Sequence, residues 1–273
     1  MGTLYIVPTP IGNLEDITLR ALRVLREVAL IAAEDTRTSG VLLKHYEITT
    51  PTTSYHEHNK LGKLDVIFDA LAAGDVALIS DAGTPGISDP GYELINAAIE
   101  RGHRVEPLPG ANAVIPALVG SGLPTDSFIY AGFLPKKASA KRDFFKSIAD
   151  ETRTLIVYES PHRLVDTLAL LAELLPDRPI CVAREISKRF EDFQRGTASE
   201  VHDYYAENPP RGEITLLIGG AVVADDLPWD EERVRVALQA RLDAGESHSS
   251  AAKAVAAQSG WKKRVVYALV TDG

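Results

Sequence analysis

Short apolar runs rich in β-branched residues alternate along most of the chain with amphipathic or turn-rich stretches. Runs of this kind predict β-strands, and their alternation with helical patterns predicts an α/β fold. We expect strands at 4–7, 29–33, 76–80, 104–107, 128–132, 154–158, 179–183 and 214–218. The run 189–196 is a weaker strand candidate because it is more polar.

Helical periodicity supplies the elements between these strands. In 17–28, leucine and valine recur at helical spacing while arginines occupy another side, which predicts a helix packed on a sheet through one stripe. A second helix is predicted at 91–101, with Asp89 or Pro90 opening it and Asp89 as its N-cap. Further helices are expected at 114–120, 141–149 and 161–174.

Turn-forming residues divide the chain into three parts. Gly, Pro and polar residues gather at 121–126, which predicts a hinge between two α/β halves. Beyond Gly220 only helical patterns remain, at 230–244, 249–259 and 262–270. We expect α/β domains at 1–122 and 123–222 and a small helical domain at 229–273. Its three helices resemble a helix-turn-helix module, although three short helices are also an ordinary packing unit.

Composition places the chain among globular proteins, with 273 residues, 45% hydrophobic and 25% charged. The single cysteine, Cys181, excludes an intrachain disulfide and a thiol-rich metal site. The first residues carry neither a basic segment nor a long apolar one. We therefore expect a cytoplasmic protein that does not enter a membrane.

The formal net charge of −9 argues against a globally basic nucleic-acid binder. A local cluster of basic residues can still bind nucleic acid on a chain that is acidic overall. Basic residues gather in three clusters, which are Lys136, Lys137, Lys141, Arg142 and Lys146; Arg184, Lys188 and Arg189; and Lys262, Lys263 and Arg264. Such runs are also typical of solvated helix faces.

The loop after the first strand contains two prolines, Pro8 and Pro10. Glycine-rich turns at this place bind the pyrophosphate of dinucleotides through backbone N–H groups, which proline lacks. The loop therefore disfavours a dinucleotide. It is also compatible with a rigid surface turn.

A richer loop, 81–91, follows the apolar strand at 76–80. Its glycines allow backbone to approach a ligand, and Asp81 and Asp89 supply negative charge, which repels phosphate and suits a cation. S-adenosylmethionine carries an ammonium and a sulfonium and fits this pattern. A third loop, 107–113, precedes a helix of small residues, which would leave space for a ligand or allow a close helix–sheet contact.

Eight segments carry a family resemblance, in the order "VPTPIGNLEDIT", "AAEDTRTS", "SDAGTPGISDPG", "PLPGANA", "FIYAGFLP", "YESPHR", "AREISK" and "RGEITLLIGG". Together they resemble the ribosomal RNA small subunit methyltransferase I group of the tetrapyrrole methylase superfamily. The resemblance implies two α/β domains with S-adenosylmethionine in the cleft between them, a small appended helical domain, and a homodimer. It also implies methyl transfer to a cytidine ribose 2′-oxygen in the decoding region of 16S rRNA. The acidic charge favours the assembled small subunit over naked RNA as the substrate.

The resemblance also places a set of residues near the cofactor. They are Pro10, Ile11, Asp81, Ala82, Gly83, Thr84, Ala111, Asn112, Tyr158, Ala183, Gly212, Glu213 and Ile214. The prolines of the first loop favour the RNA branch over the porphyrin and corrin methylases, which remain the alternative. A further alternative is a ribosome-assembly factor without catalytic activity.

A ribose hydroxyl is a poor nucleophile at neutral pH and needs a base or nearby positive charge. The catalytic candidates are Glu159, Arg163, Glu185 and Lys188, because they follow apolar strands and can face one cleft. Glu159 and Arg163 are equally compatible with a structural ion pair.

Three other groups of polar residues carry weaker hypotheses. His162 is a candidate base with little specific support. Arg37 has two interpretations, one as an RNA phosphate contact and one as the partner of Asp35. His56 and His58 lack a third ligand in register, so no metal is expected.

Overall fold

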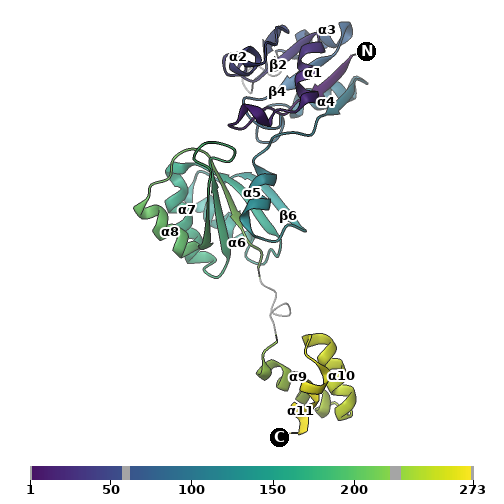
Figure 1. Cartoon of the computed structure of the whole chain (residues 1–273), viewed down its shortest axis with the longest axis vertical. Helices are drawn as coiled ribbons and strands as arrows, with labels where there is room; N and C mark the ends of the chain where they lie inside the picture. Colours follow the sequence, from purple (N-terminus) through teal and green to yellow (C-terminus); the bar gives the residue numbers. More distant parts are fainter. Residues whose placement is uncertain (1, 57–61, 222–228, 272–273) are drawn as a thin grey trace. The chain divides into compact units, whose positions relative to one another are not determined.

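The computed structural model describes residues 2–56, 62–221 and 229–271, which belong to two compact units. The first unit, Met1–Ala221, holds two β-sheets with their helices, and the second, Val222–Gly273, holds the last three helices (Figure 1).

The first sheet is parallel, with the order β3-β2-β4-β1-β5. Its strands are β1 (Thr3–Ile6), β2 (Leu30–Ala33), β3 (Thr52–Ser54), β4 (Val76–Ile79) and β5 (Arg104–Pro107). Helices α1 (Leu19–Glu27) and α2 (Thr36–His45) share one hydrophobic cluster with the sheet, and α3 (Leu64–Ala73) and α4 (Tyr92–Glu100) share another. Coverage of both faces explains why every residue of β4 is buried.

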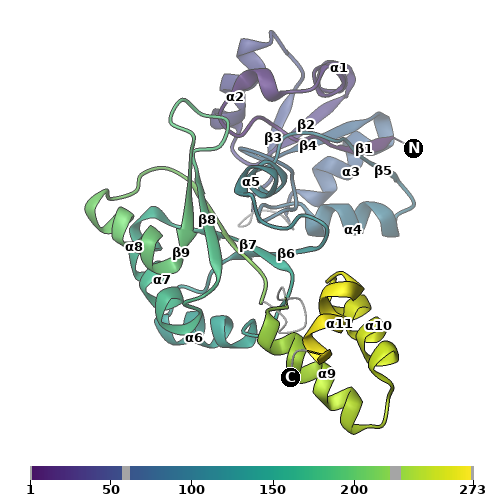
Figure 2. The same cartoon turned by 60° about the horizontal axis from the view of Figure 1, so that its bottom comes forward.

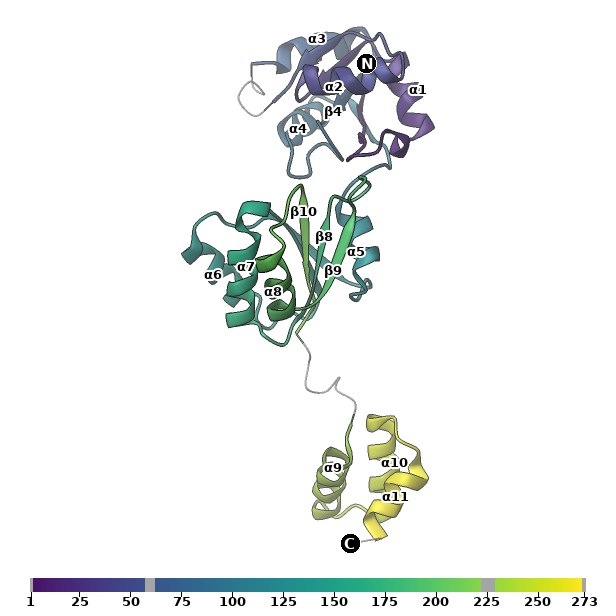
Figure 3. The same ribbon diagram turned by 60° about the vertical axis from the view of Figure 1, so that its left-hand side comes forward.

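The second sheet is mixed, with the order β6-β7-β10-β8-β9. Its strands are β6 (Phe128–Phe133), β7 (Thr154–Glu159), β8 (Pro179–Arg184), β9 (Asp192–Thr197) and β10 (Ile214–Ile218). Helices α6 (Ala138–Ser147), α7 (Pro161–Leu174) and α8 (Ala198–Glu207) lie on one face and α5 (Val114–Ser121) on the other (Figure 3).

Helix α5 packs on the second sheet, so the chain crosses between sheets at 108–113, ahead of the boundary at 122 that composition predicts. The contact is close: a Cβ at Gly120 would lie 2.5 Å from the Phe193 ring. Arg195 donates hydrogen bonds to the carbonyls of Gly120 and Ser121. Gly122, with φ of 80°, ends the helix. The small residues of α5 therefore serve helix–sheet packing.

The second unit consists of α9 (Glu231–Asp243), α10 (His248–Ser259) and α11 (Lys263–Thr271) in its described part, and Figure 2 shows the three helices. Its core contains Val234, Leu238, Ala251, Ala252, Val255 and Val266, all buried. The Trp261 indole N–H donates to the Trp229 carbonyl at 2.9 Å, which holds the entry to α9 against the start of α11.

Eight strands occur where the apolar runs predict them, and the polar run after 189 forms β9 at 192–197. Strand β3 and helices α2, α3 and α8 were not among the elements expected from the sequence. Among the described residues, no helix is long and apolar enough to cross a membrane.

Candidate functional site

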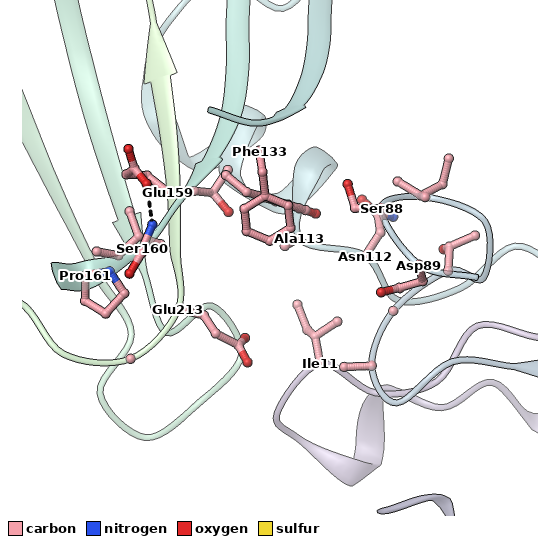
Figure 4. A pocket seen from close by; sticks show the side chains of 18 residues that line it. Ile11, Ser88, Asp89, Asn112, Ala113, Phe133, Glu159, Ser160, Pro161 and Glu213 are labelled. Atoms are coloured by element: carbon pink, nitrogen blue, oxygen red, sulfur yellow. Dashed lines mark hydrogen bonds between the residues drawn. The ribbon is translucent and has the colours of Figure 1, made fainter. Parts of the chain in front are cut away.

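A cavity of about 360 Å³ opens in the first unit beside the carboxyl ends of β4, β6 and β7 and the segment that leads into β10. It is lined by Ile11, Ala82, Gly83, Thr84, Ile87, Ser88, Asp89, Asn112, Ala113, Phe133, Tyr158, Glu159, Ser160, Pro161, Gly212, Glu213, Ile214 and Thr215. Figure 4 shows Ile11, Asp89 and Asn112 on one side, and Glu159, Pro161 and Glu213 on the other. The carboxyl ends of sheet strands are the usual ligand site in α/β proteins.

The first two loops are joined by backbone hydrogen bonds. Thr9 N donates to Gly83 O at 2.9 Å, and Gly83 N donates to Thr9 O at 2.8 Å. The buried Thr9 hydroxyl donates to Ser80 O at 3.0 Å. Gly83 has φ of 81°, and a Cβ there would contact the Ile11 side chain at 3.5 Å. The pairing therefore holds Ile11 over Gly83 as an apolar wall.

The third loop joins the same wall through side chains. The Thr84 hydroxyl donates to Ala111 O at 3.2 Å. The Asn112 carboxamide oxygen accepts from Ile115 N at 2.9 Å, which fixes the start of α5. Thr84 and Asn112 therefore order backbone around the cavity with their own side chains already engaged.

Asp89 lines the cavity and does not cap α4, which corrects the expectation from sequence. The helix begins at Tyr92, its N-cap position is Gly91, and no side chain caps it. Gly91 has φ of 156° and turns the chain, so Asp89 points into the cavity (Figure 4). Burial raises the pKa of Asp89 to about 6, and the charges of Glu34 and Asp81 add to the rise.

Asp81 links the ends of two strands outside the cavity lining. Its Oδ1 accepts from Asp35 N at 3.1 Å, and its own N–H donates to Glu34 Oε2 at 3.2 Å. Partial burial raises the pKa of Asp81. Glu34, Asp81 and Asp89 thus surround this side of the cavity with negative charge. Arg37 pairs with Asp35 at 2.6 Å, as one of its two interpretations predicts.

Aromatic rings form the opposite wall. The ring centroids of Phe133 and Tyr158 lie 5.3 Å apart, as do those of Tyr130 and Tyr158. The Tyr130 and Ser88 hydroxyls are hydrogen-bonded at 2.6 Å. Burial raises the pKa of Tyr158 well above its ordinary value, so its hydroxyl stays protonated. Phe133 is 61% exposed and offers a ring face to a planar ligand.

Glu159 is the centre of a buried charged network. Its carboxylate accepts hydrogen bonds from Ser160 N at 2.7 Å, Lys141 Nζ at 2.8 Å and the Thr167 hydroxyl at 2.7 Å, and it pairs with Arg163 at 2.5 Å. Its side chain has no exposed area. With both oxygens engaged, Glu159 fits the structural ion pair better than a base. Lys141, which sequence places in a basic cluster, is buried here.

Glu185 and Lys188 lie behind the cavity wall that Gly212 and Glu213 form. Lys188 Nζ is 3.0 Å from Glu185 Oε1 and 3.2 Å from Glu213 Oε2. Glu185 Oε1 also accepts from Glu213 N at 2.9 Å. Although partial burial opposes it, the Glu213 N–H and the Lys188 ammonium lower the pKa of Glu185. This cluster fixes the segment that leads into β10.

The structure brings most of the expected cofactor residues to the cavity. Those that line it are Ile11, Ala82, Gly83, Thr84, Asn112, Tyr158, Gly212, Glu213 and Ile214. Pro10, Asp81, Ala111 and Ala183 do not line it, and Ala183 is buried beneath α5. Of the catalytic candidates, Glu159 lines the cavity, whereas Arg163, Glu185 and Lys188 support its walls.

Several lining residues were not among the site residues expected from the sequence. They are Ile87, Ser88, Ala113, Phe133, Ser160, Pro161 and Thr215, whereas Asp89 was expected as a source of negative charge in its loop. Phe133 carried a usable signal, because it ends an apolar strand just before the turn at Leu134 and Pro135. His58 lies outside the described residues, and within the described ones no group of three metal-ligating side chains occurs.

Comparison with known proteins gives the family. The model of the Tetrapyrrole (Corrin/Porphyrin) Methylases matches residues 3–202. A Synechocystis protein named ribosomal RNA small subunit methyltransferase I is 47% identical over 271 residues, which cover 98% of this chain and 97% of that protein. A relative of the same name from Halalkalibacterium halodurans is 45% identical, over 97% of this chain and 93% of its own.

A solved structure agrees in fold. Uroporphyrin-III C-methyl transferase from Thermus thermophilus, complexed with S-adenyl homocysteine, has a TM-score of 0.53 at 21% identity over 80% of this chain and 97% of its own. The chain therefore belongs to the tetrapyrrole methylases and, within them, to the ribosomal RNA small subunit methyltransferase I family.

Proposed function

We propose that this protein is an S-adenosylmethionine-dependent methyltransferase that modifies a cytidine of small-subunit ribosomal RNA, in the decoding region, at the ribose 2′-oxygen. The observation that carries the proposal is the cavity, with an acidic wall at Asp89 facing an aromatic wall at Tyr158 and Phe133. The names of the relatives at 45–47% identity support ribosomal RNA as the substrate.

The cavity fits a cationic adenosyl ligand in size and chemistry. Its volume of about 360 Å³ lies in the range of small-molecule sites. Pro8 and Pro10 lack backbone N–H groups, and the N–H of Thr9 already donates to Gly83. The stretch from Pro8 to Pro10 therefore offers no free N–H group to a pyrophosphate. The negative charge at Asp89 suits an ammonium or sulfonium.

We assign the binding roles to the expected residues that line the cavity. Backbone at Gly83, Thr84 and Gly212 would approach the ligand, Ile11 would cover it, and Tyr158 would pack against its planar part. Asp89 would face its positive charge. When bound, the cofactor supplies a methyl group on a sulfonium, and the remaining contribution of the chain is to align the acceptor hydroxyl with it.

The former catalytic candidates take supporting roles in this proposal. Glu159 and Arg163 hold Ser160 and Pro161 in the wall, and Glu185 and Lys188 hold Glu213. Because Glu159 accepts three hydrogen bonds and pairs with Arg163, we propose no proton transfer to it. Glu213 is 73% exposed at its side chain and lies at the open part of the wall, where RNA would enter.

A methylation assay tests the proposed function. Small subunits and stripped 16S rRNA from a strain that lacks this protein are incubated with the purified chain and labelled S-adenosylmethionine. Primer extension at low nucleotide concentration then maps 2′-O-methylation. We expect a new stop at one cytidine of the decoding region, with faster methylation of subunits than of naked RNA because the chain is acidic.

Three results would contradict the proposal. Methylation of a porphyrin precursor in place of RNA would favour the tetrapyrrole alternative. Binding of small subunits without any heat of S-adenosylhomocysteine binding would favour an assembly factor. A base-methylated product would refute the ribose assignment. We also propose a homodimer, which light scattering of the full chain would test.

A further inference from the structure

The last two helices carry a concentrated positive charge on an acidic chain. Between Glu246 and Asp272 the sequence contains no Asp or Glu, although the chain has 38 such residues. The same stretch contains Lys253, Lys262, Lys263 and Arg264. By contrast, α9 has Glu231 and Glu232 in its first turn. Over its whole length α9 balances three acidic against three basic side chains, so the positive charge that is concentrated in the second unit comes from the stretch that forms α10 and α11.

These cations lie together on the surface of α10 and α11. The Lys263 ammonium donates to the Ser249 hydroxyl at 3.4 Å, which brings the first turns of the two helices together. Lys253 lies one helical turn beyond Ser249 on the same side of α10. Lys253, Lys263 and Arg264 are all exposed. The two helices thus present one continuous basic surface.

The charges of this surface are not neutralised within the described part of the unit. Arg235 pairs with Glu231 and Arg241 with Glu246, each at 2.8 Å. Neither Lys253, Lys262, Lys263 nor Arg264 forms an ion pair with a described acidic side chain. Lys263 and Arg264 lie in the first turn of α11, where the positive end of the helix dipole repels cations. An anion bound to this surface would offset that repulsion.

An aromatic side chain shares the surface. Tyr267 is 40% exposed and follows Lys263 by four residues and Arg264 by three, so the three lie on one side of α11. Val266 precedes Tyr267 by one residue, about 100° around the helix, and is fully buried in the core, which fixes the orientation of the helix. Exposed aromatic rings beside cations bind unpaired bases by stacking while the cations bind phosphates. This combination favours RNA over an acidic protein as the partner.

We propose that the α10–α11 basic face, formed by Lys253, Lys262, Lys263, Arg264 and Tyr267, is an RNA-binding surface for ribosomal RNA that is separate from the cavity of the first unit. The inference rests on the proposed function for the identity of the RNA. It explains how a chain of net charge −9 can hold a polyanionic substrate: the phosphate contacts are concentrated in one small unit.

The test compares two double variants of the full chain. Lys253→Ala with Arg264→Ala removes two cations of the basic face, and Arg235→Ala with Arg241→Ala removes two paired cations of the same unit. Affinity for 16S rRNA is measured by filter binding over a series of salt concentrations. For the first variant we expect roughly tenfold weaker binding and a salt slope smaller by about 1.4, because each phosphate contact in single-stranded RNA contributes about 0.7. The control keeps the wild-type slope.

Further readouts separate this inference from the proposed function. Both variants should keep the wild-type circular dichroism spectrum and bind S-adenosylhomocysteine as the wild type does. Tyr267→Leu should weaken RNA binding, and Tyr267→Phe should restore it. If the wild type does not methylate rRNA, the proposed function is wrong. RNA binding by the basic face is then still tested by the salt slopes. Wild-type slopes in the basic-face variant, or lost binding to subunits with unchanged binding to naked rRNA, would overturn the inference.

Discussion

The buried network around Glu159 allows a quantitative prediction about stability. Replacing Glu159 with Gln removes the negative charge that faces Lys141, whose side chain is only 7% exposed. Arg163 is 25% exposed at its side chain and can turn toward solvent, but Lys141 cannot. Leaving one charge of a buried pair without its partner costs about 3–5 kcal/mol. For a unit of this size, that corresponds to a fall in melting temperature on the order of 10 °C.

Two variants on the same helix provide the controls. Arg142→Ala removes a cation next to Lys141 whose pair with Glu173 is exposed, so it should cost less than about 1 kcal/mol. Lys141→Met keeps the apolar stem and leaves Glu159 paired with Arg163. Its loss of stability should therefore lie between the losses in Arg142→Ala and Glu159→Gln. A Glu159→Gln variant as stable as Arg142→Ala would refute the reasoning.

The assay must follow the first unit alone. Both tryptophans of the chain, Trp229 and Trp261, lie in the second unit, so tryptophan fluorescence reports on that unit. Urea unfolding followed by far-ultraviolet circular dichroism reports mainly on the first unit, which holds most of the helices and both described sheets. The fluorescence transition should be the same in all variants.

Three further predictions follow from the cavity and its support. The pKa of Asp89 in the folded protein, about 6, exceeds its ordinary value of 3.8, so the contribution of Asp89 to stability is complete below pH 3.8 and is lost as pH rises through 6. Asp89→Asn should therefore stabilise the free protein by roughly 1–3 kcal/mol near pH 8, and thermal unfolding near pH 4 and pH 8 checks this expectation. Gly120→Ala should cost about 1–3 kcal/mol in urea unfolding, because its Cβ would lie 2.5 Å from Phe193; an unchanged midpoint would contradict the close contact. Phe133→Ala should weaken S-adenosylhomocysteine binding about tenfold by loss of stacking on the planar part of the ligand, with near wild-type affinity in Phe133→Trp, and equal affinities of both variants would refute stacking.

The sequence predicts the strands of this fold well, because their apolar runs are short, rich in β-branched residues and bounded by turns. Helix α8 was not predicted because its buried residues Ala198, Val201 and Tyr205 are separated by charged ones. Its clearest sequence signal is the capping box of Thr197 and Glu200. The loop at 81–91 was identified from its glycines, its charges and its place after a strand, and 212–214 from the family resemblance.

The remaining site residues depend on contacts between distant segments. The sequence places Lys141 in a basic cluster, yet in the structure Lys141 pairs with Glu159 on another element. The sequence predicts Asp89 as the N-cap of a helix, yet the helix starts only at Tyr92, after the turn at Gly91. Local pattern predicts which residues end a strand or begin a helix, but it does not predict which charges meet inside the fold.

Binding of S-adenosylhomocysteine, followed by isothermal titration calorimetry, tests most directly whether this cavity holds the methyl donor. Ala82 lines the cavity and is exposed, so Ala82→Trp fills the space without disturbing the core, and Ala140→Trp on the exposed start of α6 is the matched control. We predict binding by the wild type and by Ala140→Trp, and none by Ala82→Trp. Unchanged binding by Ala82→Trp, or a nicotinamide or flavin dinucleotide that binds in place of S-adenosylhomocysteine, would contradict the assignment.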